Sequence, residues 1–363
     1  MTSIADDTRE YDAWLRTQCQ VDEKTLRMKH KIMREDVFRF LRATYYRWAR
    51  RVDALLPDLA KAPRALCVGD IHVENFGAWR DGDGRLVWGV NDFDEAAEMP
   101  FAYDLVRLVT SIRLAPAIGV GKRAVADAVL EGYEAGLAAP RPTLPDEHDL
   151  ILRREFALLD SARSKFWEKI AALPDAKPPA SIARALSAHM PDGAQKLRYA
   201  SRVAGAGSLG RPRYVLIAAW HGGTIVREAK ALVPSAWDWA HGLSRPQRYT
   251  ELSHGAYRSP DPWLGIDEAA KVVVRRLSAS ARKIELSDLR NGLLREHLIR
   301  SMGFDLGAIH AGTPRKAPAL KAFLTAQPRD WLQPLCVEHP PMTRARSNAR
   351  RRLSAAGPAY PQS

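Results

Sequence analysis

The chain has 363 residues, of which 46% are hydrophobic and 27% charged, a balance typical of a globular protein with one large or two ordinary domains. No run reaches the roughly 18 apolar residues that a membrane-spanning helix needs, and the polar start from Met1 to Glu10 is unlike a secretory signal. The net charge of +13 favours anionic partners such as nucleotides, phosphorylated compounds or nucleic acid.

The cysteines indicate a reducing compartment. Cys19, Cys67 and Cys336 lie far apart and form no metal-binding or redox motif. We therefore expect a cytoplasmic protein without a membrane partner.

Residues 23–56 are expected to form a helix, because apolar side chains recur there every three or four residues. Lys31 and Arg42 interrupt this pattern. Either they reach phosphate groups, or their stems lie along the helix surface with the charged ends in water. The sequence leaves both alternatives open.

The most informative stretch lies between residues 65 and 104. An apolar run ends at Val68 and delivers Asp70, and Asn75 follows one short loop later. The turn sequence Asp-Gly-Asp-Gly at 81–84 lies between two apolar runs and predicts a hairpin, which brings Asp92 back towards Asp70. In phosphoryl transfer, one Asp orients the attacking hydroxyl while an Asn and a second Asp hold Mg²⁺, and this layout suits that division of roles.

These motifs carry a resemblance. Gly-Asp-x-His-x-x-Asn-Phe-Gly at 69–77 and Asn-Asp-Phe-Asp-Glu at 91–95 resemble those of an uncharacterised bacterial family, domain of unknown function 2252. They also resemble the aminoglycoside and choline kinase branch of the protein-kinase-like fold. The resemblance can be followed from about residue 31 to 310. Metallophosphoesterases share the Gly-Asp-x-His opening, but their further Asp and Asn-His motifs are missing here.

The expected roles follow from this reading. Asp70 orients or deprotonates the acceptor, and Asn75 and Asp92 hold Mg²⁺. Asp94 binds a second metal ion or a partner arginine. His72 braces the loop, and Asp104 anchors it from the following helix.

Helices are expected at about 105–112, 122–138, 147–172 and 180–190. Beyond them, residues 203–210 contain the pattern G-x-G-x-x-G, with Gly205, Gly207, Ser208 and Gly210 as expected phosphate contacts. A dinucleotide-binding loop leads into a helix, whereas this one leads into a strand-like run at 214–220. A glycine-rich loop joining two strands is the arrangement that covers phosphates in kinases, although an ordinary hairpin stays a second interpretation.

The next strand, at 224–230, is expected to carry the basic group that binds the nucleotide phosphates. Strand alternation places Arg227 on the more apolar face and Lys230 on the other. We expect Arg227 to make this contact, with Lys230 as the second candidate. The resembled family usually has Lys in this context, so Arg227 is a departure from it.

Later segments complete the prediction. Residues 244–258 are expected to form a helix in which Glu251 pairs with that basic residue. A strand at 271–277 and a long helix at 288–311 follow, with His310 as a structural residue. The arginine-rich end from 341 to 363 is expected to be a disordered tail, with contact to nucleic acid as the alternative.

Together these elements predict an α+β, two-lobed, protein-kinase-like fold in circularly permuted order, because the catalytic motifs precede the glycine-rich loop. The expected divisions are a catalytic and metal-binding half at 1–140, a helical segment at 141–200, a nucleotide lobe at 201–287, C-terminal helices at 288–340 and the tail.

The expected function is ATP- and Mg²⁺-dependent phosphoryl transfer to a small-molecule hydroxyl. Its expected partners are a nucleotide and an acceptor, and not nucleic acid. Three alternatives stay open. The first is an enzyme on the same frame that transfers AMP. The second is a nucleotide-binding module without catalysis, which Arg227 in place of Lys would favour. The third is a basic protein that binds nucleic acid.

Overall fold

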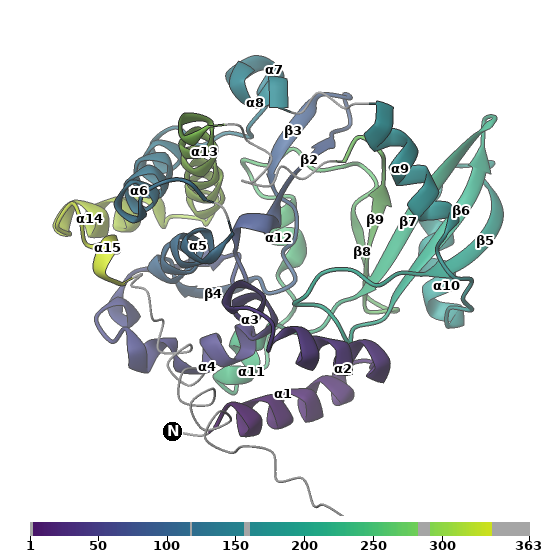
Figure 1. Ribbon diagram of the computed structural model, residues 1–363, viewed down its shortest axis with the longest axis horizontal. Helices are drawn as coiled ribbons and strands as arrows, with labels where there is room; N and C mark the ends of the chain where they lie inside the picture. Colours follow the sequence, from purple (N-terminus) through teal and green to yellow (C-terminus); the bar gives the residue numbers. More distant parts are fainter. Residues whose placement is uncertain (1–2, 117, 156–159, 282–290, 336–363) are drawn as a thin grey trace, which may run out of the picture.

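The computed structural model describes residues 3–116, 118–155, 160–281 and 291–335. It has a mixed α+β architecture, in which a five-stranded antiparallel sheet stands beside a larger and mostly helical body (Figure 1). None of the described helices is long and apolar enough to cross a membrane. The expected tail at 341–363 lies outside the described residues.

Four helices begin the chain: α1 (Ile4–Gln18), α2 (Glu23–Ile32), α3 (Val37–Ala43) and α4 (Tyr45–Leu55). The continuous helix expected over residues 23–56 is therefore wrong, because the chain restarts its helix twice. The Asp36 carboxylate caps α3 by accepting a hydrogen bond from the Arg39 N–H at 2.7 Å. At the other end of α3, the Thr44 hydroxyl bonds the Phe40 carbonyl at 2.7 Å and marks the second break.

The 3₁₀ turn η1 (Leu59–Lys61) precedes two short antiparallel strand pairs, and a second turn, η2 (Val73–Asn75), follows their first strand in the chain. Strand β1 (Arg64–Cys67) pairs with β4 (Ala97–Pro100). Strands β2 (Phe76–Arg80) and β3 (Leu86–Val90) form the predicted hairpin. The Asp81 side chain accepts hydrogen bonds from the backbone N–H groups of Asp83 and Arg85 and so stabilises its turn.

The helical body is held together by a close helix pair, α6 (Lys122–Ala138) and α13 (Gly292–Ala311). A Cβ on Gly132 would lie 1.9 Å from the Arg300 carbonyl oxygen, and one on Gly303 would lie 2.2 Å from the Val129 carbonyl oxygen, so only glycine permits this approach. Helix α5 (Ala102–Leu114) is buried beside this pair. As a result, segments from both ends of the chain share one hydrophobic core. The short helices α7 (Pro145–His148), α8 (Leu150–Glu155), α14 (Ala317–Ala326) and α15 (Leu332–Leu335) complete this body.

The sheet has the order β5-β6-β7-β9-β8. Its strands are β5 (Gln195–Ser201), β6 (Arg213–Trp220), β7 (Gly223–Ala231), β8 (Gly265–Asp267) and β9 (Val272–Leu277). Helix α9 (Asp160–Ala171) packs on the face that carries Val215 and Val226. Helix α10 (Ala180–Ala188) packs on the opposite face, which carries Leu216 and Ala229. Helices α11 (Ala236–Ala240) and α12 (Tyr249–Ser253) lie between β7 and β8 in the chain.

Candidate functional site

One pocket collects most of the residues singled out in the sequence. It lies between the glycine-rich loop that joins β5 to β6 and the loops that follow β1 and β3. Its charged lining residues come from segments more than a hundred positions apart: Lys29, Arg42, Asp70, Asp92, Asp94, Glu95, Arg202, Arg211, Arg213 and Arg275. The tertiary fold thus brings the two aspartate motifs and the glycine-rich loop to one place.

The loop that carries Asp70 is tied down from α5. The Asp104 carboxylate accepts hydrogen bonds from the Val68 N–H at 2.7 Å and the Gly69 N–H at 3.1 Å. Gly69 has φ +81°, and a Cβ there would lie 2.3 Å from the Glu95 carbonyl oxygen, so the turn needs glycine. The expected anchoring of this loop by Asp104 is therefore confirmed.

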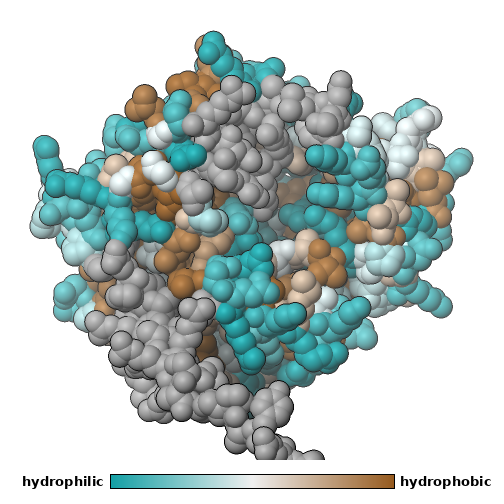
Figure 2. Space-filling model, in the orientation of Figure 1, coloured by the Kyte–Doolittle hydropathy of each residue, from teal (hydrophilic) through white to brown (hydrophobic). Residues whose placement is uncertain are grey.

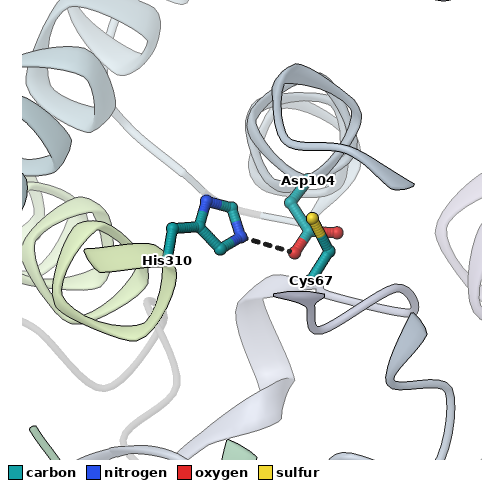
Figure 3. A group of neighbouring side chains, drawn as sticks. All are labelled: Cys67, Asp104 and His310. Carbon is teal, nitrogen blue, oxygen red and sulfur yellow. Dashed lines mark hydrogen bonds and ion pairs between the residues drawn. The ribbon is translucent and has the colours of Figure 1, made fainter. Parts of the chain in front are cut away.

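Asp104 also belongs to a buried group with Cys67 and His310. The potential metal-ligand atoms of these three side chains lie within 4.8 Å of one another (Figure 3). The His310 Nε2 atom lies 3.2 Å from Asp104 Oδ2, and His310 Nδ1 lies 2.9 Å from the Tyr133 hydroxyl. Burial raises the pKa of the Cys67 thiol well above its usual range. Both His310 ring nitrogens already have hydrogen-bond partners, and the Asp104 carboxylate holds two backbone N–H groups of the Asp70 loop. We therefore interpret this group as a support for the Asp70 loop, with His310 in the structural role expected for it.

Asp70 itself is held at one oxygen. The buried Arg107 guanidinium donates two hydrogen bonds to Asp70 Oδ1 and a third to the Leu41 carbonyl. Arg107 also lies over the rings of Tyr45 and Trp48, with its Cζ 4.9 and 5.3 Å from their centroids. Burial raises the pKa of Asp70 to about 6, and Arg107 opposes that rise.

Asn75 joins the two aspartate motifs. Its Nδ2 atom donates to the backbone carbonyls of Asp70, at 3.3 Å, and of Asp92, at 3.2 Å. These two bonds assign the amide orientation, because only the NH₂ group can donate. The Asn75 Oδ1 atom is thereby left as the oxygen that could bind a metal ion. His72 is buried and lines the same pocket, and its carbonyl accepts the Asn75 N–H at 2.8 Å.

Asp92 and Asp94 converge on one buried ammonium group. Lys230 Nζ lies 3.0 Å from both Asp92 carboxylate oxygens and 2.6 Å from Asp94 Oδ2. Burial raises the pKa of Asp94 to about 6, and the neighbouring Asp92 charge adds to the rise. Burial also disfavours the Asp92 charge, but Lys230 outweighs it and holds the pKa of Asp92 well below its usual range. Arg211 pairs with Asp94 at 3.3 Å, so the arginine partner expected for Asp94 is present.

The glycine-rich loop approaches Asp70 directly. A Cβ on Gly207 would lie 3.2 Å from Asp70 Oδ2 and 3.0 Å from the Arg42 carbonyl oxygen. Gly205 and Ser208 line the pocket as well. Gly210 does not, because its backbone turns away to bond Asp22 and Thr25 of the α2 N-terminus and it packs on Leu26.

Below the loop, the buried Glu228 carboxylate gathers three guanidinium groups. Arg213 and Arg275 pair with its Oε1 at 2.8 and 3.1 Å, and Arg202 pairs with its Oε2. These charges hold the pKa of Glu228 well below its usual range although burial opposes ionisation. One carboxylate therefore fixes a row of arginines along the pocket wall.

Two expected contacts are wrong. Arg227 lies on the α10 face of β7, where its Cζ sits 4.4 Å from the centre of the Trp263 ring and its Nε donates to the His189 carbonyl. The opposite face of the strand carries Glu228 and Lys230, and their ion-pair partners line the pocket. Glu251 lies on α12 with 52% of its side chain exposed and pairs with Arg248. Of the two basic residues in the first helical region, Arg42 lines the pocket and Lys31 is exposed.

Several residues at the site escaped the sequence analysis, among them Lys29 and Arg211 of the pocket lining and Arg107, which holds Asp70 from behind. Two of these three carry a usable signal. Arg107 interrupts the apolar run Leu105–Val109, and a cation on a buried helix requires an acidic partner. Lys29 stands at the same helical spacing as the buried Leu26 and Ile32, so it belongs to the inner face of α2.

The comparisons with known proteins agree with part of this reading. The model of a family described as an uncharacterised protein conserved in bacteria, DUF2252, matches residues 20–140. This stretch includes all five catalytic and metal candidates, Asp70, His72, Asn75, Asp92 and Asp94, and stops before the glycine-rich loop. No curated protein and no solved structure matches the chain.

Proposed function

We propose that this protein is an ATP- and Mg²⁺-dependent phosphotransferase that acts on the hydroxyl of a small molecule. The observation that carries the proposal is the double hydrogen bond of Asn75 to the carbonyls of Asp70 and Asp92. It joins the backbones of the two aspartate motifs at one pocket. The Asp70 carboxylate would orient the acceptor there, and the Asn75 and Asp92 side-chain oxygens would bind a metal ion.

The residues suit a magnesium ion. Mg²⁺ prefers oxygen ligands and takes few from the protein, and the Asn75 amide oxygen and the Asp92 carboxylate supply them. Asp94 adds an oxygen, Oδ1, that is buried without a hydrogen-bond partner among the described residues. A bound Mg²⁺ would neutralise charge on the nucleotide phosphates. Lys230, placed between the two aspartates, would bind those phosphates from β7.

The glycine-rich loop supports the same proposal. It joins two antiparallel strands, β5 and β6, and reaches within contact distance of the Asp70 carboxylate across the pocket. We propose that this arrangement is the two-lobed, kinase-like one, with the lobe that binds nucleotide following the catalytic half in the chain. Circular permutation of this kind is tolerated when the joined ends lie at the surface.

Asp70 would act on the acceptor. Its Oδ1 is neutralised by Arg107, and its Oδ2 faces the loop. A carboxylate held in this way can accept the hydroxyl proton and orient the oxygen towards the terminal phosphate. Asp70→Asn should therefore lower turnover by about a hundredfold or more while leaving MgATP affinity nearly unchanged.

The experiment compares four proteins by calorimetry with MgATP and by turnover, including slow ATP hydrolysis: the wild type, Asp70→Asn, Asp92→Asn and Asp83→Asn. Asp92→Asn should lose the Mg²⁺ dependence of nucleotide binding. Asp83 is 84% exposed in the hairpin turn, so its variant is the matched control. Nucleotide binding that persists with unchanged Mg²⁺ dependence in Asp92→Asn would refute the metal site, and undiminished turnover in Asp70→Asn would remove Asp70 from the mechanism.

The same assay separates the rival functions. The mass of the modified acceptor distinguishes transfer of a phosphate from transfer of AMP. The argument for a non-catalytic module rested on Arg227 as the phosphate contact, whereas the basic residue of β7 beside Asp92 and Asp94 is Lys230.

A further inference from the structure

One end of the pocket is built by the N-terminal helices and is not used by the proposed chemistry. Tyr11 of α1, Lys29 of α2 and Tyr46 of α4 meet there. The two tyrosine rings stack with centroids 4.4 Å apart, and Lys29 Nζ lies 5.6 Å from the centre of each. In Figure 2 the visible outer surface over α2 is mainly hydrophilic, whereas Lys29 lies on the inner face of α2 with 4% of its surface exposed.

Lys29 differs from the other cations of the pocket. Arg211 bonds Asp94 and Glu95, and Arg42 pairs with Glu74. The remaining three arginines share Glu228. Among the residues that the structure describes, Lys29 Nζ has no carboxylate within ion-pair distance and no hydrogen-bond acceptor.

A buried ammonium without a partner is costly. Burial lowers the pKa of Lys29 to about 8, and the Arg211 charge contributes to the decrease. The side chain nevertheless stays largely protonated at neutral pH. A cation in this state binds an anion strongly, because most of its water has already been removed.

The position of Lys29 separates it from the proposed metal ligands. The Arg211 guanidinium donates to the Tyr11 hydroxyl and to Asp94 Oδ2, each at 3.3 Å, and therefore lies between the two ends of the pocket. Asp70 faces the same pocket as Lys29.

We propose that Lys29 binds an anionic group of the acceptor, a phosphate or a carboxylate, so that the substrate is an anionic hydroxyl compound. This inference deepens the proposed function and rests on it. The acceptor hydroxyl lies at Asp70, and its charged group lies against Lys29, beside the stacked rings of Tyr11 and Tyr46. A neutral alcohol or a cationic amino sugar would leave the ammonium uncompensated.

The test titrates three related compounds into the protein saturated with Mg²⁺ and a non-hydrolysable ATP analogue: glycerol 3-phosphate, glycerate and glycerol. We expect at least one of the two anions to bind about tenfold more tightly than glycerol. Whether the phosphate or the carboxylate binds better identifies the anionic group. Lys29→Met should weaken this anion by about tenfold or more and leave the affinity for the nucleotide analogue within about twofold.

Lys31→Met is the matched control, because it removes the same charge from the exposed side of the same helix and should change neither affinity. The proposal is overturned if no anion of the panel binds better than glycerol, or if Lys29→Met binds it as the wild type does. It is also overturned if Lys29→Met loses the nucleotide analogue to the same extent, since Lys29 would then belong to the nucleotide site. Titration of the anions in the absence of nucleotide measures anion binding by itself. A failure of the proposed phosphotransferase therefore stays distinguishable from a failure of anion binding at Lys29.

Discussion

Replacing Lys29 with Met should make the ligand-free protein more stable, although Lys29 is proposed to bind substrate. Met keeps most of the length of the lysine stem and removes the ammonium from a site where only 4% of the residue is exposed. A residue retained at a cost in stability is typical of a binding site. The prediction concerns the folded protein alone and does not depend on knowing the ligand.

The magnitude follows from the pKa of Lys29, which falls from 10.5 to about 8 in the folded protein. At ~1.4 kcal/mol for each pKa unit, the charged form destabilises the folded state by about 3 kcal/mol at pH 7. Met forgoes the contacts of the ammonium with two tyrosine rings, worth about 1 kcal/mol. The free energy of unfolding should therefore rise by about 2 kcal/mol at pH 7.

The pH dependence gives the sign of the effect. Below pH 8 Lys29 is protonated in both states and the full penalty applies; between pH 8 and 10.5 the folded state loses the proton first, so the penalty decreases as pH rises. The charged groups that act on Lys29 are Arg211, which lowers its pKa, and Asp12, Glu95 and Asp70, which raise it. Their effects on the ammonium are already contained in the pKa of Lys29, so they add no separate contribution.

Urea unfolding of the wild type, Lys29→Met and Lys31→Met at pH 7 and pH 10 measures this effect. The advantage of Lys29→Met should shrink by about 2 kcal/mol between the two pH values. Lys31→Met should stay within about 0.5 kcal/mol of the wild type. A Lys29→Met protein that is no more stable than the wild type at pH 7, or whose advantage does not depend on pH, would refute the reasoning.

Other positions yield further expectations. Gly132→Ala should reduce the free energy of unfolding by about 3 kcal/mol in urea titrations, because its Cβ would meet a backbone carbonyl of α13 at 1.9 Å, whereas Gly82→Ala, with open space around it, should be nearly neutral. Gly207→Ala should lower turnover and leave stability within about 1 kcal/mol, since its Cβ would stand 3.2 Å from a carboxylate oxygen of Asp70; unchanged turnover would contradict the proposed approach of the loop. Asp104→Asn should lower the melting temperature and turnover together. Its free energy of unfolding should fall by about 2 kcal/mol, because a charge-assisted hydrogen bond is weakened. A variant that loses neither stability nor turnover would show that the anchor is dispensable.

Local features of the chain were readable from the sequence. Asp81 and the two glycines of its turn specify a hairpin through hydrogen bonds within five residues, so no distant segment is needed. The placement of Asp92 at the end of that hairpin follows from the register alone. The short loop between Asp70 and Asn75 likewise keeps these two residues together. The spacing of the site's first half was therefore decided locally.

The choice between Arg227 and Lys230 was not local. Both residues fit strand β7, and alternation says only that they lie on opposite faces. Which face meets the pocket depends on α10, which covers the Arg227 side, and on Asp92 and Asp94, which arrive at the Lys230 side from more than a hundred residues away. The expectation that the more apolar face of β7 meets the pocket was wrong, because α10 covers that face.

The partners of the charged residues were likewise decided only by the tertiary structure. Arg107 and Arg211 are separated in sequence from the carboxylates they bond, and nothing near them in the chain indicates which acid each will meet. A buried charge is tolerated only where the folded chain supplies its compensation. The sequence could therefore indicate which aspartates and glycines gather at the pocket, while the packing of the N-terminal helices and the sheet decided which cations join them and which described cation has no ion-pair partner there.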